Sequence, residues 1–187
     1  MSANLDYEIN KELGECYLFM GDMDKAEEYY LKAAGSNGVH PDPYLGLATI
    51  AVQRGDLNKA MGLYQQAADI EPNDKSLAGL ALVEMETGAQ ESAFDHFCRA
   101  LELNPENMVA VFGIIQAGHA LNRIEQIIPR LTDCLELNPA KHDIRYSLAG
   151  CLSSMGRNED AISELERILE QEPDHSAANE LYKMLRP

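Results

Sequence analysis

Apolar residues recur three and four positions apart in short blocks along this chain, and each block is bounded by a glycine or a proline. The stretch from Tyr44 to Pro72 is the clearest example. It contains two such blocks separated by Gly55-Asp56, and Pro72 closes the second. This spacing is typical of a helix with one buried face, and Gly and Pro mark helix ends. The stretch therefore predicts two helices joined by a tight turn.

The same pattern returns every 33 or 34 residues. One position in the second helix of each unit is alanine in four units and isoleucine in the fourth: Ala26, Ala60, Ala93, Ile127 and Ala161. The turn position is glycine or asparagine: Gly21, Gly55, Gly88, Asn122 and Gly156. Asparagine is the usual substitute for glycine where the backbone is left-handed. A single hairpin cannot bury its apolar faces alone, so the period predicts a stack of hairpins.

These units resemble the tetratricopeptide repeat (TPR) family, whose pattern runs aromatic, Leu-Gly, Tyr, Ala, Phe, Pro. The first unit matches at Leu13-Gly14, Tyr17, Ala26 and Tyr30, and the second at Tyr44, Leu47-Ala48, Ala60, Tyr64 and Pro72. The fourth unit departs most, because Ile114-Ile115 and Ile127 replace small residues. The resemblance implies an all-α, right-handed superhelical solenoid of five TPR hairpins in a single domain, residues 1–187. The repeats are expected at about 7–40, 41–73, 74–107, 108–141 and 142–175.

The ends and two internal breaks carry further expectations. The cap signal Asp174-His175-Ser176 and the apolar stripe after it predict a capping helix over about 176–186. Residues 1–6 are predicted to be a frayed end. The run Gly35-Ser36-Asn37-Gly38 is predicted to end the second helix of the first unit early. Pro129 lies inside the second helix of the fourth unit, where it removes a backbone hydrogen bond, so a kink and an altered angle between units four and five are expected.

The charge limits the range of partners. The chain has 15 Lys and Arg against 31 Asp and Glu, a net charge of −16. Phosphate backbones repel such a surface, so no nucleic acid is expected as a partner. Because no apolar stretch of about 18 residues occurs, no membrane insertion is expected either. The acidic residues are explained by solvated helix faces, and the alternative is a basic partner.

The cysteines predict a reducing environment. Cys16, Cys98, Cys134 and Cys151 show no CxxC spacing. Cys16 and Cys151 occupy equivalent positions that are expected to face inward, where a free thiol behaves as a small apolar group. Together with the absence of a basic region and an apolar run at the start, this predicts a cytoplasmic location without a signal peptide.

The sequence offers no catalytic constellation. The five histidines form no HExxH pair, and neither a P-loop nor a GxGxxG motif occurs. We therefore expect no enzymatic activity, no cofactor and no metal.

Function is expected on the concave surface, which the first helices line in the family that this chain resembles. The face opposite the Leu-Gly packing face selects a candidate groove: Leu45, Thr49, Val52, Leu82, Met85, Phe112, Gln116, His119 and Tyr146. Its middle is apolar, which is typical of an interaction site. The alternative is that some of these residues are core. A clamp for a C-terminal carboxylate is disfavoured, because Lys11 fits that pattern but Glu15 and Gly79 do not.

The sequence thus predicts a scaffold or adaptor that binds a peptide or helix of a partner protein, basic or amphipathic in character. Two alternatives stay open. One is a cytoplasmic secretion or assembly chaperone for an exported subunit, and the other is a non-catalytic accessory module of an enzyme on another chain. The oligomeric state is not predicted.

Overall fold

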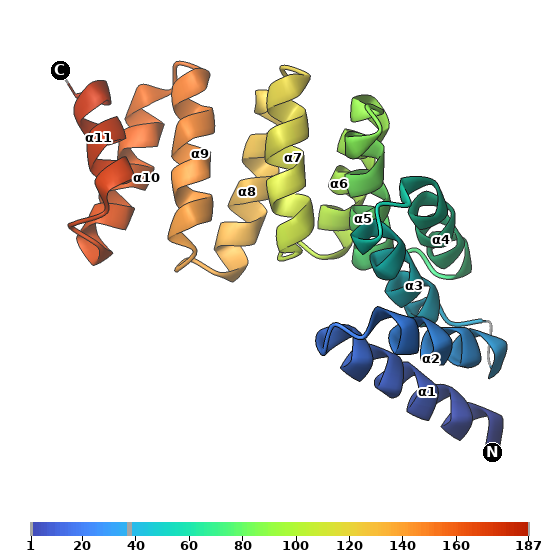
Figure 1. The fold of residues 1–187 in the computed structure, drawn as a ribbon. Helices are drawn as coiled ribbons and strands as arrows, with labels where there is room; N and C mark the ends of the chain where they lie inside the picture. Colours follow the sequence, from blue (N-terminus) through green and yellow to red (C-terminus); the bar gives the residue numbers. More distant parts are fainter. Residues whose placement is uncertain (1, 37–38, 187) are drawn as a thin grey trace.

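The structure is a computed structural model that describes residues 2–36 and 39–186. In these residues it contains eleven α-helices and no strand (Figure 1). In chain order the helices are α1 (Ser2–Phe19), α2 (Met23–Ser36), α3 (Asp42–Gln53), α4 (Leu57–Ile70), α5 (Asp74–Glu86), α6 (Gln90–Leu103), α7 (Met108–Ala120), α8 (Ile124–Leu137), α9 (His142–Ser154), α10 (Asn158–Gln171) and α11 (Ser176–Leu185). The predicted all-α superhelical repeat fold is confirmed.

Consecutive helices pair into five hairpins, α1–α2 to α9–α10, which we call units one to five. The turn residue of every hairpin has a positive φ, from 55° at Asn122 to 87° at Gly88. This left-handed conformation is the reason for glycine at four of the five turns, and asparagine is among the few other residues that adopt it readily. The predicted turn positions are confirmed.

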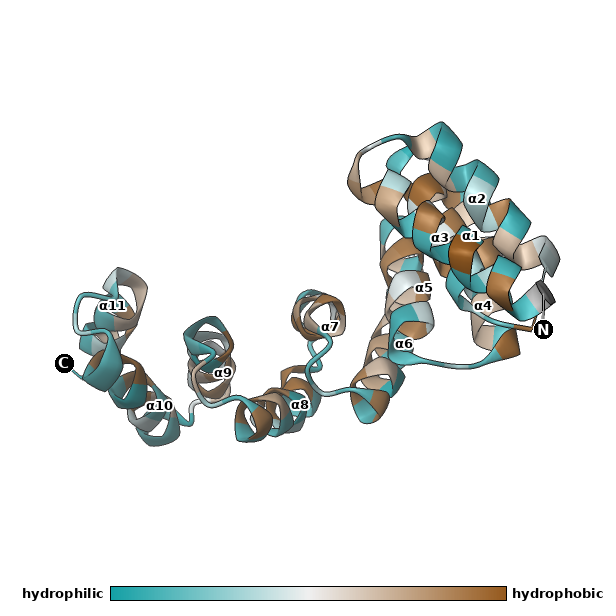
Figure 2. Cartoon of the chain, turned by 90° about the horizontal axis from the view of Figure 1, so that it is seen from below, coloured by the Kyte–Doolittle hydropathy of each residue, from teal (hydrophilic) through white to brown (hydrophobic). Residues whose placement is uncertain are grey.

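The hairpins stack into an arch. Figure 2 shows α7 and α9 on its inner side, and α8 and α10 on its outer side. Each first helix packs mainly against the second helix of the preceding unit, as α9 does against α8. In units one to four the first helices also contact one another, α1 with α3, α3 with α5 and α5 with α7. The first helices of the hairpins are therefore the elements that present side chains to the inside of the arch.

Polar side chains fix where several helices begin. Asn73 and Ser76 form a reciprocal capping box at the start of α5, and the side chain of Asn107 accepts a hydrogen bond from the backbone of Ala110 at the start of α7. Asn107 also donates to Asp74 over 2.8 Å, and Asn104 donates to the same carboxylate over 2.9 Å. These bonds tie the start of α5 to the start of α7, and so set the spacing of two inner helices.

Successive units are held together by an aromatic ring that lies against a glycine. Tyr30 of α2 contacts Gly46 of α3, and the pair returns as Tyr64 with Gly79 and as Phe97 with Gly113. A Cβ atom on any of these three glycines would lie within 2.4 Å of a ring carbon. Only a residue without a side chain allows the ring so close, so these glycines are packing positions rather than turn positions.

The ring-on-glycine pair changes at the junction of units four and five. The equivalent positions are Leu131 on α8, which is fully buried, and Ser147 on α9, which is half-buried. Leucine is smaller than the aromatic ring and serine is larger than glycine, so the total volume at the contact is conserved. Pro129 lies inside α8 without dividing it, since α8 is one helix from Ile124 to Leu137. The altered angle that was expected between these units stays a prediction.

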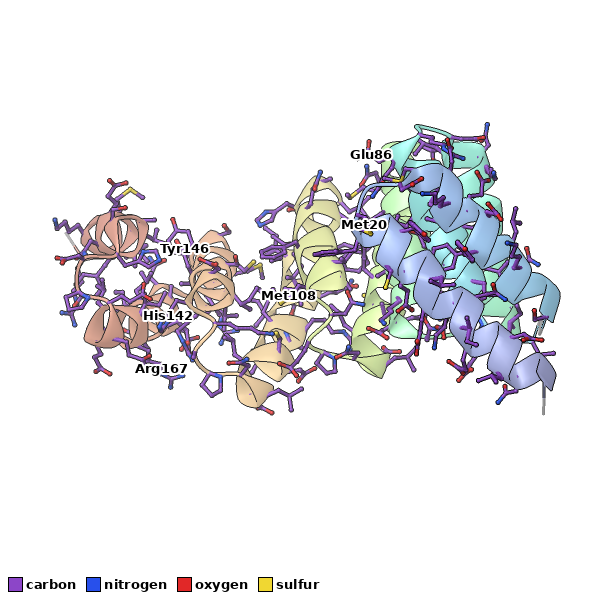
Figure 3. All side chains as sticks on the ribbon, turned by 60° about the horizontal axis from the view of Figure 1, so that its bottom comes forward. Met20, Glu86, Met108, His142, Tyr146 and Arg167 are labelled. Atoms are coloured by element: carbon purple, nitrogen blue, oxygen red, sulfur yellow. The ribbon has the colours of Figure 1, made fainter. Side chains whose placement is uncertain are left out.

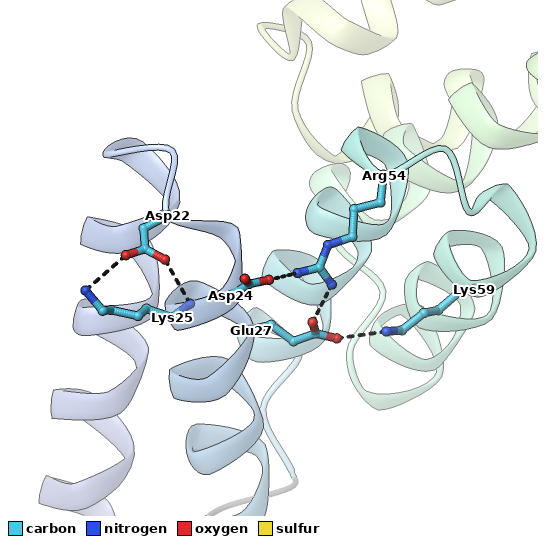
Figure 4. Close-up of polar contacts among 6 residues, drawn as sticks. All are labelled: Asp22, Asp24, Lys25, Glu27, Arg54 and Lys59. Carbon is cyan, nitrogen blue, oxygen red and sulfur yellow. Dashed lines mark hydrogen bonds and ion pairs between the residues drawn. The ribbon is translucent and has the colours of Figure 1, made fainter.

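An ion-pair network also joins units one and two (Figure 4). The guanidinium of Arg54 donates to Asp24 over 2.7 Å and pairs with Glu27, and the Lys59 ammonium donates to Glu27 over 2.8 Å. The Lys59 and Arg54 hydrogen bonds hold the pKa of Glu27 below its usual value. The carboxylate of Glu27 therefore joins α2 to both helices of unit two.

Three expectations are wrong. Residues 2–6 are part of α1 rather than a frayed end, and Tyr7 behind them is buried and anchors that turn. α2 continues through Gly35 to Ser36, whose hydroxyl donates to the carbonyl of Lys32 over 2.8 Å. Asn37 and Gly38 lie outside the described residues. Cys16 is exposed rather than inward-facing, because no helix of the described residues covers that side of α1.

Candidate functional site

A cleft of about 310 Å³ lies on the inner side of the arch, between α1, α3, α5 and the start of α7. Four successive first helices each contribute an aliphatic side chain to its lining: Leu18, Leu45, Leu82 and Val109. The helix register explains this, because each position lies on the face opposite the one that packs into the stack. We call this cleft the inner groove.

A second cleft of about 350 Å³ adjoins the inner groove. Val52, Leu57 and Glu86 line it, and it shares Tyr64, Gly79 and Leu82 with the inner groove. Leu82 is 37% exposed and Val52 is 40% exposed. Apolar surface is therefore available along two turns of α3 and α5.

The nine residues predicted from the sequence all lie on α3, α5, α7 and α9. Five of them are exposed: Val52, Leu82, Phe112, Gln116 and His119. The other four are half-buried: Leu45, Thr49, Met85 and Tyr146. None is fully buried, so each is accessible to a partner. The two clefts bring together Leu45, Thr49, Val52 and Leu82. Met85 packs partly against the core.

The predicted residues of α7 and α9 lie outside these two clefts. Phe112 is 51% exposed and lies one turn after Val109, so it extends the apolar surface of the groove along α7. The ring of Tyr146 stacks on His175 at 6.0 Å between centroids, and Nε2 of His119 lies 4.0 Å from Sγ of Cys151. Figure 3 labels Tyr146 and His142, which lie one turn apart on α9. Two of the predicted groove residues, His119 of unit four and Tyr146 of unit five, thus already have partners within the chain.

The rim of the groove is mostly acidic. Glu15 and Asp42 line the first cleft together with Lys75, and Glu86 lines the second. The hydroxyl of Tyr7 donates to Asp42 over 3.5 Å, and burial, followed by the charge of Asp42, raises the pKa of Tyr7 to about 12. Burial likewise raises the pKa of Tyr30, which lies beneath the groove, to about 12. Both tyrosines are neutral at physiological pH, so the carboxylates dominate the electrostatic field at the groove.

Part of this lining was not predicted from the sequence. Asp42, Lys75 and Val109 line the groove one turn before Leu45, Ala78 and Phe112 on the same helices. The three-residue spacing is itself the signal that finds them, because residues i and i+3 share a helix face. Ala78, by contrast, contributes to the lining although its side chain is 1% exposed.

Within residues 2–36 and 39–186, no three His, Cys, Asp or Glu side chains gather to hold a metal ion. In the same residues, no helix combines the length and the apolar character that crossing a membrane requires. The inner groove is open and apolar with an acidic rim, which suits the recognition of another chain.

Comparison with known proteins agrees with this reading. Two family models, both described as tetratricopeptide repeat, match residues 11–75 and 119–185. Together they cover more than half of the chain. The chain belongs to the tetratricopeptide repeat family. TPR proteins bind protein or peptide partners and are generally non-catalytic, so the fold is that of a protein–protein interaction module.

Solved TPR structures share the fold at low sequence identity. The structure of Pseudomonas aeruginosa pilF has a TM-score of 0.74 at 16% identity and covers 100% of this chain and 93% of its own. The structure titled YrrB, a TPR protein with an unusual peptide-binding site, has a TM-score of 0.69 at 18% identity, covering 93% and 90%. At these identities the likeness shows the fold alone.

Curated relatives match over parts of their length. BBSome complex member BBS4 of Bos taurus is 34% identical over 107 residues, which is 57% of this chain and 20% of BBS4. Photosystem I assembly protein Ycf3 of Synechococcus elongatus is 36% identical over 73 residues, 37% of this chain and 42% of Ycf3. The chain thus spans less than half the length of the curated relatives it matches.

Proposed function

We propose that this chain is a non-enzymatic scaffold that binds an amphipathic segment of a partner protein along the inner groove. The exposed apolar surface of Leu82, Val52 and Phe112 carries the proposal, because exposed apolar patches on folded proteins usually mark interaction sites. In helix-in-groove recognition an amphipathic helix lays its apolar face into a hydrophobic groove, and the inner groove offers apolar side chains on successive first helices, Leu45, Leu82 and Val109.

The charge of the rim narrows the partner. Glu15, Asp42 and Glu86 flank the apolar lining and only Lys75 opposes them there. A segment with apolar side chains on one face and Lys or Arg beside them satisfies both features. A carboxylate-terminated peptide is disfavoured, since the acidic groups repel it and Lys11 already pairs with Glu8 over 2.9 Å.

A role in assembly is a second candidate. The observation that favours it is the similarity to Ycf3, which is named a photosystem I assembly protein. A chaperone of this kind holds an unassembled subunit in the same groove, so both candidates use the same surface.

We also propose that the protein works in a reducing, cytoplasmic compartment. The four cysteines support this proposal, because all of them are free thiols.

The test begins with a pull-down in which the intact chain captures its partner, which mass spectrometry identifies. The partner is then titrated against Leu82→Ala, Phe112→Ala and a control variant, Leu137→Ala, whose side chain is 60% exposed on α8. We expect the two groove variants to weaken binding by at least about 1 kcal/mol each, the usual threshold for a significant interface residue. The control should bind like the wild type.

Melting temperatures separate binding from folding. Phe112 is half exposed, so its truncation leaves no closed cavity and the fold should survive. Wild-type affinity in both groove variants, with loss of binding in Lys11→Ala, would show that the groove reads an end carboxylate instead. A partner released at a defined step of complex assembly would favour the chaperone role over a permanent scaffold.

A further inference from the structure

The outer side of α1 carries an apolar stripe that nothing in the described residues covers. Leu5, Ile9, Phe19 and Met20 are 62%, 47%, 94% and 73% exposed, and Cys16 is exposed as well. At 100° per residue these positions lie opposite Tyr7 and Gly14, which pack into the hairpin. Figure 3 labels Met20 at the turn that follows α1. We call the set Leu5, Ile9, Glu12, Cys16, Phe19 and Met20 the N-terminal face.

The middle of the N-terminal face is built like the interfaces inside the stack. The positions equivalent to Ile9 in units two to five are all buried: Pro43, Ser76, Ala110 and Ile144. The positions equivalent to Cys16 are also all buried: Ile50, Val83, Ala117 and Cys151. In those units the second helix of the preceding hairpin covers them. At Ile9 and Cys16 the surface of α1 therefore matches positions that seat a helix in every other unit, whereas the positions equivalent to Phe19 are exposed there.

One position differs and points to the chemistry of the occupant. Where units two to four carry Gly46, Gly79 and Gly113, unit one carries Glu12, which is exposed. A side chain here occupies the space that an aromatic ring fills at the later junctions. A helix on this face therefore presents no ring at its centre. A basic side chain satisfies the carboxylate, whose desolvation without a partner is costly.

The charge of the chain argues against a second copy as the occupant. Two chains with a net charge of −16 each repel one another. An antiparallel pairing of two α1 helices also places Glu12 beside Glu12, because this residue lies at the middle of the stripe. Glu8 and Glu15 flank the stripe on one side and add to the repulsion. A basic helix gains from the same groups.

We propose that the N-terminal face binds a basic amphipathic helix of another protein, with its apolar side chains against Ile9 and Phe19 and a Lys or Arg opposite Glu12. α1 has 18 residues, so it can pair with a helix of about five turns, roughly 27 Å long. This surface lies outside the inner groove, so a helix bound to it leaves the groove open. The proposal does not rest on the proposed function of the groove.

The test uses two synthetic 18-residue helical peptides with leucine on one face and either lysine or glutamate elsewhere. Fluorescence anisotropy measures the binding of each peptide to the intact protein. We expect the lysine peptide to bind and the glutamate peptide to bind at least tenfold more weakly. Ile9→Asp should weaken the lysine peptide at least tenfold, although it adds a negative charge. Glu12→Lys should weaken the lysine peptide and strengthen the glutamate peptide.

Matched controls locate the bound peptide. Leu137→Asp adds the same charge at another exposed apolar side chain and should leave the affinity unchanged, as should Phe112→Ala in the groove. The bound lysine peptide should also slow the alkylation of Cys16, measured by mass spectrometry, without slowing that of the half-buried Cys98. Circular dichroism confirms that each variant is folded.

Two results would overturn the proposal. If Phe112→Ala releases the lysine peptide and Ile9→Asp does not, the peptide lies in the groove and the N-terminal face is not its site. If sedimentation shows a dimer that Ile9→Asp dissociates, the occupant is a second copy of this chain. Failure of Leu82→Ala and Phe112→Ala to affect the pulled-down partner bears on the groove alone.

Discussion

Replacing Gly113 by alanine tests whether the ring-on-glycine contact holds the stack together. The added Cβ would lie 2.2, 2.4 and 2.6 Å from three ring carbons of Phe97. Carbon atoms that are not bonded approach to about 3.5–4.0 Å, so the ring must move by more than about 1 Å. Phe97 is 0% exposed, and protein interiors leave no free space of that size. Neighbouring side chains of units three and four must therefore shift with it.

The size of the effect follows from two opposing contributions. Overpacking a core costs about 1–3 kcal/mol, and the completely buried ring places this site at the upper end. Alanine in place of glycine inside a helix gains up to about 1 kcal/mol. The net loss of unfolding free energy should therefore be about 2 kcal/mol. For a chain of this size that corresponds to a fall in melting temperature of about 4–8 °C.

Gly62→Ala is the matched control. Gly62 lies inside α4 and is exposed, and an added Cβ there meets nothing within 4 Å. This variant should gain about 0.4–1 kcal/mol, because only the entropy of the unfolded chain changes. Thermal and urea unfolding followed by far-ultraviolet circular dichroism measure both variants under the same conditions. The two variants should thus change stability in opposite directions.

A second substitution identifies the cause. Phe97→Leu in the Gly113→Ala background copies the smaller side chain that Leu131 provides at the next junction. The double variant should be more stable than the sum of the single effects predicts, since the ring that clashes is gone. Equal stability of Gly113→Ala and Gly62→Ala would refute the reasoning, because it would show that the ring yields without cost.

Three further outcomes are expected. Ala60 is fully buried, so Ala60→Leu should lower the free energy of unfolding by about 1–3 kcal/mol in the same unfolding assay, and an unchanged midpoint would contradict the packing described here. A thiol titration of the native protein should show Cys16 reacting first, and Cys134 and Cys151 reacting only after unfolding. Burial shields the thiols of Cys134 and Cys151 from the reagent and raises the pKa of each. Equal reaction rates for all four thiols would contradict this difference in burial. The lowered pKa of Glu27 means that its ion pairs stabilise the fold above the unfolded pKa of about 4.3 and that this contribution is lost as the pH falls through the lower folded value. Urea midpoints between about pH 6 and pH 3 should therefore fall less steeply in Glu27→Gln than in the wild type, and parallel curves would exclude the network as a contributor.

The helices and their turns are determined by short stretches of sequence. The spacing of apolar residues at 3.6 per turn depends only on neighbours along the chain, and so does the left-handed turn that requires Gly55 or permits Asn122. Repetition then adds information, because five copies in register show that the same local unit recurs. The prediction that Leu45 and Leu82 face the groove combined this register with the resemblance to the TPR family, whose first helices line the concave surface.

The tertiary structure decides what each repeated position does in its own unit. In the sequence, Gly46, Gly79 and Gly113 look like ordinary helical residues. Only the structure shows that an aromatic ring lies against each of them, because each ring is on a different helix, 15 or 16 residues before its glycine. Cys16 and Cys151 occupy the same position in the repeat, yet one is exposed and the other is buried. The physical reason is that burial depends on the neighbouring hairpin and not on the residue, and only the structure shows which side of each hairpin has a neighbour.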